Sequence, residues 1–251
     1  MIRARGVCFS FPGRAVLQDL TIDIEESLTT VIVGRSGIGK SVFLKCITGL
    51  LRPQAGSITI DGEEVVGSPR AQLRTIRRRI GMLFQEGALF DSMSVYENVA
   101  FPLVYHWAAT GKEIDRRVRA YLDLVGMLEY VHAMPQELSG GMKRKVAVAR
   151  AMILEPRYLL YDEPTAGLDP ESAAVVESMM RRLQREGAIT SLVVTHDIDL
   201  TRYIADRIAL MEEGRISAHA GREDAFQESS AIYEHFIKNR ERIRSENGSQ
   251  T

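Results

Sequence analysis

A glycine-rich loop between a short apolar run and a helical pattern constrains the fold of this chain more than any other feature. The apolar run, Leu28 to Val33, predicts a buried strand. In such a strand–loop–helix unit, glycines let the backbone N–H groups turn inward, and the helix adds the positive end of its dipole. The loop consists of Gly34, Arg35, Ser36, Gly37, Ile38, Gly39, Lys40 and Ser41. This is a complete phosphate-binding loop, in which we expect Lys40 to reach the terminal phosphates and Ser41 to join the shell of a Mg²⁺ ion.

An acidic pair follows a second apolar run much further along the chain. Tyr158 to Tyr161 predicts an interior strand, and Asp162 and Glu163 come directly after it. A carboxylate in this position can hold Mg²⁺ through water beside a phosphate loop, the role that we expect for Asp162. Glu163 is then placed to polarise the attacking water as a general base. Two acids after a strand are often only a turn, but their combination with a phosphate loop favours a nucleoside triphosphate site.

Strand-like and helix-like segments alternate along most of the chain, which is typical of a mostly parallel sheet covered by helices. Leu192 to Thr195 is another short apolar run suited to an interior strand. Two antiparallel hairpins are also predicted, one from Ser57 to Ile60 with its Asp61-Gly62 turn, the other over residues 208–217. The helix after the phosphate loop is expected to carry its apolar face at Phe43, Leu44, Ile47 and Leu50. The sequence therefore predicts an α/β fold with added antiparallel strands.

The middle of the chain, about residues 88–150, has a different pattern. Ser94 and Glu97 have the spacing of a capping box, which starts a helix. An amphipathic helix is expected to follow and to end before Gly126. Its apolar positions are Ile114, Val118, Tyr121, Leu122 and Val125. Because the stretch has little strand character, we predict a helical subdomain inserted into the α/β core.

The composition is that of an ordinary globular protein, with a net charge of −1 from 32 basic and 33 acidic residues. That balance gives no sign of a nucleic-acid partner. Cys8 and Cys46 lie far apart without metal-like spacing, and Cys46 is expected to be a buried thiol. No signal-peptide pattern and no run long enough to span a membrane were recognised, which favours a cytosolic protein.

Several further segments, in a fixed order, narrow the family. Leu138-Ser139-Gly140-Gly141 precedes a helix predicted over residues 143–154, so that Ser139 is a natural N-cap and the glycines leave room for an anion. The other segments are the pair Phe9 and Phe11, Gln85 after a strand-like run, Ala166-Gly-Leu-Asp169, and His196 at the end of a strand. Together with the phosphate loop and the acidic pair, this set resembles the ATP-binding-cassette (ABC) superfamily over about residues 1–220.

The resemblance implies a role for each segment. Phe11 would stack on adenine, with Phe9 in the core. Gln85 would sense Mg²⁺ and the attacking water, and His196 would contact the γ-phosphate. Ser139, Gly140 and Gly141 would grip the ATP bound to a second copy, and Asp169 would lie in the loop that links the two sites. The family's signature usually ends in glutamine, whereas Met142 stands here, and its effect stays open.

The resemblance also implies a P-loop ABC nucleotide-binding domain with a RecA-like core sheet, an antiparallel β subdomain and the helical insertion. Two copies would enclose two ATP molecules with Mg²⁺ and drive two permease subunits. Superfamily members in DNA repair, chromosome organisation or translation are an alternative, but they typically carry two cassettes or a long coiled coil. A scaffold without hydrolysis is another alternative, against which Glu163, Gln85 and His196 argue.

The segment Gly87 to Ser92, Gly-Ala-Leu-Phe-Asp-Ser, resembles the ATPase of Mla-type, Mce-associated phospholipid transporters. That likeness implies a protein on the cytoplasmic face of the bacterial inner membrane, with a small STAS-domain protein and a periplasmic Mce-domain protein as further partners. An amino-acid importer or a lipoprotein-release system is the rival interpretation.

The tail over residues 221–251 carries an apolar stripe followed by basic residues. The stripe consists of Ala225, Phe226, Ile232, Phe236 and Ile237, and the basic residues are Lys238, Arg240, Arg242 and Arg244. Packing on its own domain is the first interpretation, and docking on a second copy or a partner is the alternative. Residues 245–251 are expected to be disordered.

Overall fold

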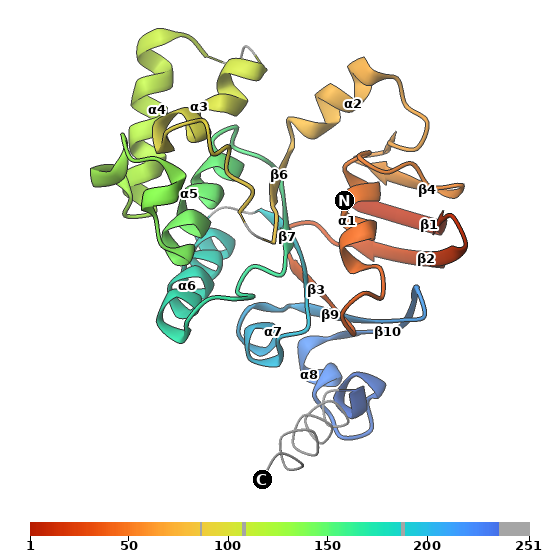
Figure 1. The fold of residues 1–251 in the computed structure, drawn as a ribbon. Coiled ribbons are helices and arrows are strands. Elements are labelled where there is room, and N and C mark those ends of the chain that lie inside the picture. Colours follow the sequence, from red (N-terminus) through yellow and green to blue (C-terminus); the bar gives the residue numbers. More distant parts are fainter. Residues whose placement is uncertain (86, 107–108, 187–188, 236–251) are drawn as a thin grey trace.

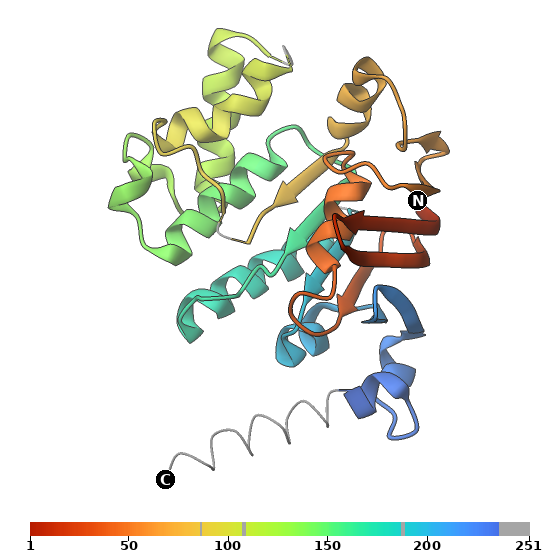
Figure 2. The same cartoon turned by 45° about the vertical axis from the view of Figure 1, so that its right-hand side comes forward.

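The structure is a computed structural model that describes residues 1–85, 87–106, 109–186 and 189–235. Two β-sheets lie side by side, and a group of helices stands apart from them on the far side of the larger sheet (Figures 1 and 2). The strands are β1 (Ile2–Phe11), β2 (Arg14–Ile24), β3 (Thr29–Val33), β4 (Ala55–Ile60), β5 (Glu63–Glu64), β6 (Ile80–Leu83), β7 (Tyr158–Asp162), β8 (Thr190–Thr195), β9 (Arg207–Glu212) and β10 (Arg215–Gly221). The helices are α1 (Lys40–Ile47), α2 (Arg70–Arg77), α3 (Val95–Tyr105), α4 (Gly111–Leu124), α5 (Gly140–Met152), α6 (Pro170–Glu186), α7 (Ile198–Ile204) and α8 (Arg222–Ala225), with 3₁₀ turns at Leu128–Tyr130 and Pro135–Glu137.

The larger sheet has the strand order β10-β9-β3-β8-β7-β6. Its strands run parallel, apart from β10, which pairs antiparallel with β9 at the edge. Every residue of β3, β7 and β8 is buried, because both faces of the sheet are covered. The predicted mostly parallel sheet is confirmed, as is the hairpin of β9 and β10.

The smaller sheet is antiparallel, with the order β2-β1-β4-β5. Helix α1 lies between the two sheets, and its Phe43, Leu44 and Ile47 are fully buried in one core with residues of both. The β4–β5 hairpin confirms the prediction for residues 57–62. This packing fixes the start of α1, and with it the glycine-rich loop, against both sheets.

One prediction for the first helix is wrong. Leu50 was expected on the apolar face, but α1 ends at Ile47 and Leu50 is 53% exposed. The amides of Gly49 and Leu50 donate back to the carbonyls of Cys46 and Lys45, which is a Schellman end that turns the chain out of the helix. The glycine one position before Leu50 was the signal for this turn.

The elements described between β6 and β7 are helical, as the sequence predicts for residues 88–150. Ser94 caps α3 in a capping box with Glu97. Helices α3, α4 and α5 pack around a core of their own, which contains Val99, Val118 and Val146. Helix α5 also contacts β6 and α6, so it connects this group to the larger sheet.

Helices α6 and α7 cover the other face of the larger sheet. Ala225 and Ile232 are fully buried against this layer, so the described part of the tail packs on its own domain. Phe236, Ile237 and the basic residues after them lie outside the described residues. Within the described parts of the chain, no helix has the length and apolar character needed to cross a bilayer.

Candidate nucleotide site

The phosphate loop, Gly34 to Ser41, consists of the connection from β3 to α1 and the first two residues of α1, at the carboxyl end of the larger sheet. Lys40 is only 5% exposed, and its ammonium donates to the carbonyls of Gly34 at 2.7 Å and Arg35 at 3.2 Å. These bonds curl the loop around the start of α1. Burial lowers the pKa of Lys40, with the nearby Glu163 acting in the opposite direction.

The backbone of this loop fits a phosphate group. Gly39 has a φ of 118°, and a Cβ there would lie 3.0 to 3.1 Å from atoms of Val16 and Leu17. Only glycine combines that conformation with that closeness. Because α1 begins directly after it, the positive end of the helix dipole faces the concave side of the loop.

The carboxyl end of β7 brings a carboxylate to the loop. The Ser41 hydroxyl donates to Oδ1 of Asp162 at 2.7 Å, although the two residues are far apart in sequence. Burial raises the pKa of Asp162, and the bond from Ser41 opposes that shift. A hydroxyl and a carboxylate oxygen this close together are hard ligands of the kind that Mg²⁺ prefers, so these residues fit the ion.

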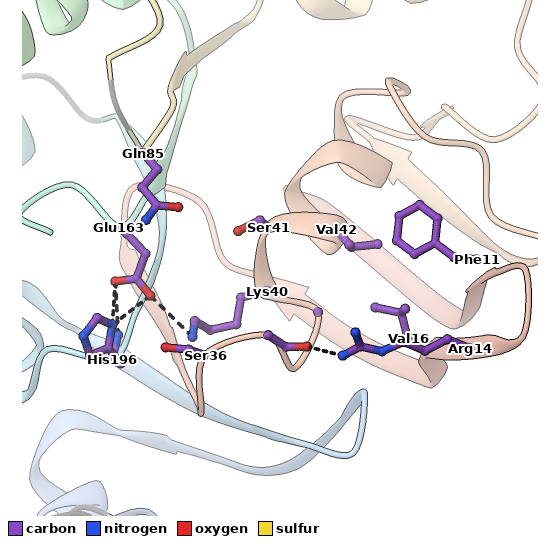
Figure 3. Close-up of a pocket in the computed structure, with 12 residues that line it drawn as sticks. Phe11, Arg14, Val16, Ser36, Lys40, Ser41, Val42, Gln85, Glu163 and His196 are labelled. Carbon is purple, nitrogen blue, oxygen red and sulfur yellow. Dashed lines mark hydrogen bonds and ion pairs between the residues drawn. The ribbon is translucent and has the colours of Figure 1, made fainter. Parts of the chain in front are cut away.

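Glu163 lies at the centre of the site. Its carboxylate approaches Nδ1 of His196 at 3.0 Å and lies 3.4 Å from the Lys40 ammonium (Figure 3). It also accepts from the Thr195 hydroxyl at 2.9 Å. Strands β7 and β8 are neighbours, which places Thr195 and His196 beside it. Its backbone has a φ of 47°, a left-handed conformation that costs a residue with a side chain about 1–3 kcal/mol.

A cavity of about 250 Å³ collects most of the predicted residues. Lys40, Gln85, Glu163 and His196 line one part of it, and Phe11 lies at the other end beyond the phosphate loop (Figure 3). Phe11 is 46% exposed, as a ring that stacks on a base must be, and Phe9 is buried as expected. The cavity therefore joins an aromatic surface to a phosphate loop and an acidic end.

The predicted residues at the starts of α5 and α6 lie elsewhere. Ser139 caps α5 by accepting from the amide of Met142, and Asp169 caps α6 by accepting from the amide of Ser172. The described residues that line the cavity do not include Ser139, Gly140, Gly141 or Asp169. Ser139, Gly140 and Asp169 are exposed. Within one copy, the structure does not bring them to the nucleotide site.

Two polar residues of the site were missed from the sequence. Arg14 lines the cavity and donates to the Gly37 carbonyl at 3.1 Å, and Thr195 binds Glu163. Arg14 follows Phe11 across a tight Pro-Gly turn, but nothing in the pattern distinguishes it from a surface arginine. Thr195 had the weak signal of its place before His196. The roles assigned to the site residues stay predictions.

The family model described as "ABC transporter" matches residues 17–166 of the chain. Among curated proteins, the chain is 37% identical to the probable ribonucleotide transport ATP-binding protein mkl of Mycobacterium leprae, over 95% of this chain and 69% of that protein. It is 37% identical to the methionine import ATP-binding protein MetN of Clostridium tetani, over 98% and 77%. It is 36% identical to the intermembrane phospholipid transport system ATP-binding protein MlaF of Haemophilus influenzae, over 95% and 90%.

Among solved structures, the fold matches the ATP-binding cassette MJ0796, in a dimeric post-hydrolysis state bound to ADP and Pi, with a TM-score of 0.81. The two chains are 30% identical, and the match covers 88% of this chain and 99% of the other. The family model and the fold thus agree with the phosphate loop and acidic residues that the structure brings together. The chain belongs to the ABC transporter family and is an ATP-hydrolysing subunit of that family.

Proposed function

We propose that two copies of this chain enclose two ATP molecules with Mg²⁺ and drive a membrane permease that moves phospholipid. The observation that carries the catalytic part is the position of Glu163. Its carboxylate lies beside Lys40 of the phosphate loop and is held by Thr195 and His196. A base fixed next to the terminal phosphates is the group that this hydrolysis requires.

In this proposal the predicted residues divide the work of binding and hydrolysis. Phe11 stacks on the base, and the loop from Gly34 to Ser41 cradles the phosphates. Ser41, Gln85 and Asp162 hold Mg²⁺, which when bound neutralises charge on the phosphates. Glu163 takes the proton of the attacking water, and His196 orients Glu163 and contacts the γ-phosphate. The shared cavity supports the assignments of the residues that line it, and the bond from Ser41 to Asp162 supports the assignment of Asp162, which lies outside that lining.

The second copy is needed because part of the predicted set lies outside the cavity. Ser139 and Gly140 stand exposed at the start of α5, and Asp169 stands exposed at the start of α6. An exposed helix start suits the γ-phosphate of an ATP bound to another copy. The similar cassette MJ0796 forms a dimer with ADP and Pi, which supports this arrangement.

The permease is proposed to dock in an apolar groove of about 410 Å³ between the larger sheet and the helical group. Its walls include Phe84, next to Gln85, and the exposed rings of Phe90 and Tyr105. Arg74 and Arg77 line an adjoining basic hollow. A short amphipathic helix of the permease with an acidic flank fits this surface.

Phospholipid is proposed as the cargo because Gly87 to Ser92 carries the Mla-type pattern and because an MlaF protein is among the relatives. The similarity to MetN proteins supports methionine import as the second candidate, and mkl proteins are named for ribonucleotide transport. The phospholipid system would include two permease subunits, a STAS-domain protein and an Mce-domain protein, at the cytoplasmic face of a bacterial inner membrane. Residues 1–220 would form the ATP-binding domain, with residues 88–150 inserted, and residues 221–251 the tail.

The test of the catalytic proposal compares wild type with Glu163→Gln, each with its permease. The variant is expected to lose about 10²–10⁴-fold in phosphate release, because the base is gone, yet to form an ATP-bound pair on size-exclusion chromatography. Glu129→Gln, an exposed carboxylate of the helical group, is the matched control and should behave like wild type. Unchanged turnover in Glu163→Gln would falsify the assignment of the base.

The cargo is tested separately in proteoliposomes that contain the ATPase and its permease. ATP-dependent transfer of a fluorescent phospholipid, abolished by Lys40→Ala, is the expected result. Uptake of labelled methionine instead, with no lipid transfer, would overturn the phospholipid assignment and favour the second candidate.

A further inference from the structure

A buried arginine on α5 connects the two sides of the proposed nucleotide sandwich. Arg144 lies five residues after Ser139 and is only 5% exposed. Its guanidinium donates through one terminal nitrogen to the carbonyl of Phe84 at 3.0 Å and through the other to the carbonyl of Ala166 at 3.1 Å. Three segments that are remote in sequence therefore meet at one side chain.

Both carbonyls belong to segments of the cavity. Phe84 directly precedes Gln85, which lines the cavity. Ala166 is tied to Glu163, because its amide donates to the Glu163 carbonyl at 3.2 Å. Arg144 therefore binds the residue directly before Gln85, the predicted Mg²⁺ ligand. It also binds Ala166, one turn after Glu163, the predicted base.

The start of α5, just before Arg144, is also tightly packed. A Cβ on Gly141 would lie 2.6 Å from the Ser172 hydroxyl oxygen, so the start of α5 is in close contact with the start of α6. The start of α5 carries Ser139, which in the proposed pair faces the other nucleotide. A displacement of Arg144 must therefore be shared by the whole first half of α5.

The guanidinium has a rigid planar geometry, so its two bonds fix the separation of the two carbonyls. If one segment moved without the other, one of these half-buried carbonyls would lose its bond to the guanidinium, which is unfavourable. The Gln85 segment, the Glu163–Ala166 turn and α5 are thereby constrained to move as one unit.

We propose that Arg144 is a positioning residue that couples the two ATP sites of the pair. It transmits a change around Gln85 and Glu163 at one ATP to the Ser139 loop that contacts the other ATP. This inference rests on the proposed pairing of two copies. It predicts that cooperativity between the sites depends on a residue that contacts neither nucleotide.

Arg150 on the same helix provides a matched comparison. It donates to the carbonyls of Gly87 at 2.7 Å and Ala88 at 2.8 Å and reaches Oδ1 of Asn98 on α3 at 3.5 Å, but it makes no described bond to the Glu163–Asp169 loop. Loss of Arg150 also leaves carbonyls without their donor, but it does not separate the segments that Arg144 joins.

The experiment measures Mg²⁺-dependent ATP hydrolysis against ATP concentration for wild type, Arg144→Ala, Arg144→Lys and Arg150→Lys, each as the full chain with its permease. Coupling between sites typically corresponds to a factor of about 5–150 in affinity. We expect Arg144→Ala to lose at least about fivefold of the wild-type coupling, so that its Hill coefficient approaches one. Arg144→Lys should retain part of the coupling, because lysine keeps the charge and the donors but lacks the planar fork that fixes the separation of the two carbonyls.

ATP binding to the single chain, followed by fluorescence titration, should change little in all variants. Thermal unfolding reports whether each variant is folded. If Arg144→Ala does not fold, the comparison is made with Arg144→Lys. A wild-type Hill coefficient in a folded Arg144 variant, or an equal loss in Arg150→Lys, would overturn the coupling role. A wild type that forms no ATP-dependent pair and shows no cooperativity would instead overturn the proposed pairing.

Discussion

At the scale of single residues, the site combines groups that are unfavourable for the folded chain. Glu163 has a left-handed backbone, Lys40 is a buried cation, and Asp162 is a buried carboxylate. Strain and buried charge of this kind persist only where the surrounding packing enforces them. Their concentration at one end of the larger sheet is what a site for chemistry on a triphosphate requires.

Asp162→Asn should stabilise the chain without nucleotide while abolishing Mg²⁺-dependent hydrolysis. Burial raises the folded-state pKa of Asp162 above its unfolded value of about 3.9. Ionisation therefore costs stability above that pH, and a neutral amide removes the cost. The expected result is a higher midpoint of thermal unfolding at pH 7, with the difference shrinking toward pH 4.

The control for this change is Asp115→Asn on α4, an exposed carboxylate paired with Arg119. Exposed pairs contribute about 0–1 kcal/mol, so this variant should unfold near the wild-type temperature. A destabilised Asp162→Asn would contradict the sign of the predicted effect.

At the scale of elements, helix α5 begins with two adjacent glycines that have different surroundings. A Cβ on Gly140 would meet only Leu168 at an ordinary 3.5 Å, whereas a Cβ on Gly141 would meet Ser172 at 2.6 Å. Both glycines are helical, so the closeness of α6, rather than backbone conformation, is what requires the second one.

The matched variants Gly140→Ala and Gly141→Ala should therefore differ in stability. Alanine in a helix is favoured over glycine by about 1 kcal/mol, so Gly140→Ala should leave the free energy of unfolding unchanged or raised. Gly141→Ala adds overpacking of about 1–3 kcal/mol and should lower it. Urea unfolding of both variants measures the difference, and equal midpoints would show that α5 and α6 are not in close contact.

At the scale of the whole molecule, histidines in two distant places make stability depend on pH. His106 follows α3, and burial with the charges of Arg74 and Arg78 lowers its pKa. His219 lies in β10, and burial with Arg207 lowers its pKa as well. The fold therefore favours the neutral form of both histidines. The stability that this preference gives the folded chain is present above the unfolded pKa of about 6.5 and is lost as the pH falls below it.

The chain should accordingly unfold at a lower temperature at pH 5.5 than at pH 7.5. A double variant, His106→Gln with His219→Gln, should show a smaller drop over the same interval, because glutamine does not take up a proton. His132→Gln in the helical group, at an exposed histidine, is the control and should keep the wild-type dependence. An unchanged drop in the double variant would exclude these two histidines as its cause.

Local sequence determined the phosphate loop, the two hairpins, the capping box at Ser94 and the cap at Ser139, because each depends on neighbours within a few residues. The exposure of Phe11 and the burial of Phe9 were expected from the family resemblance and not from strand alternation, since residues two apart in a strand share a face. Leu50 shows the limit of prediction from local sequence. The apolar helical spacing continued to Leu50, although backbone hydrogen bonds end the helix before it.

Only the tertiary structure decided which distant residues meet. Ser41 binds Asp162, Glu163 lies between Lys40 and His196, and Arg144 joins two remote carbonyls. These contacts follow from strand order and from the seating of α1 and α5, which the packing of several cores sets together. The sequence thus specified the chemical groups through local preferences, while their separations depended on the burial of apolar faces contributed by the whole chain.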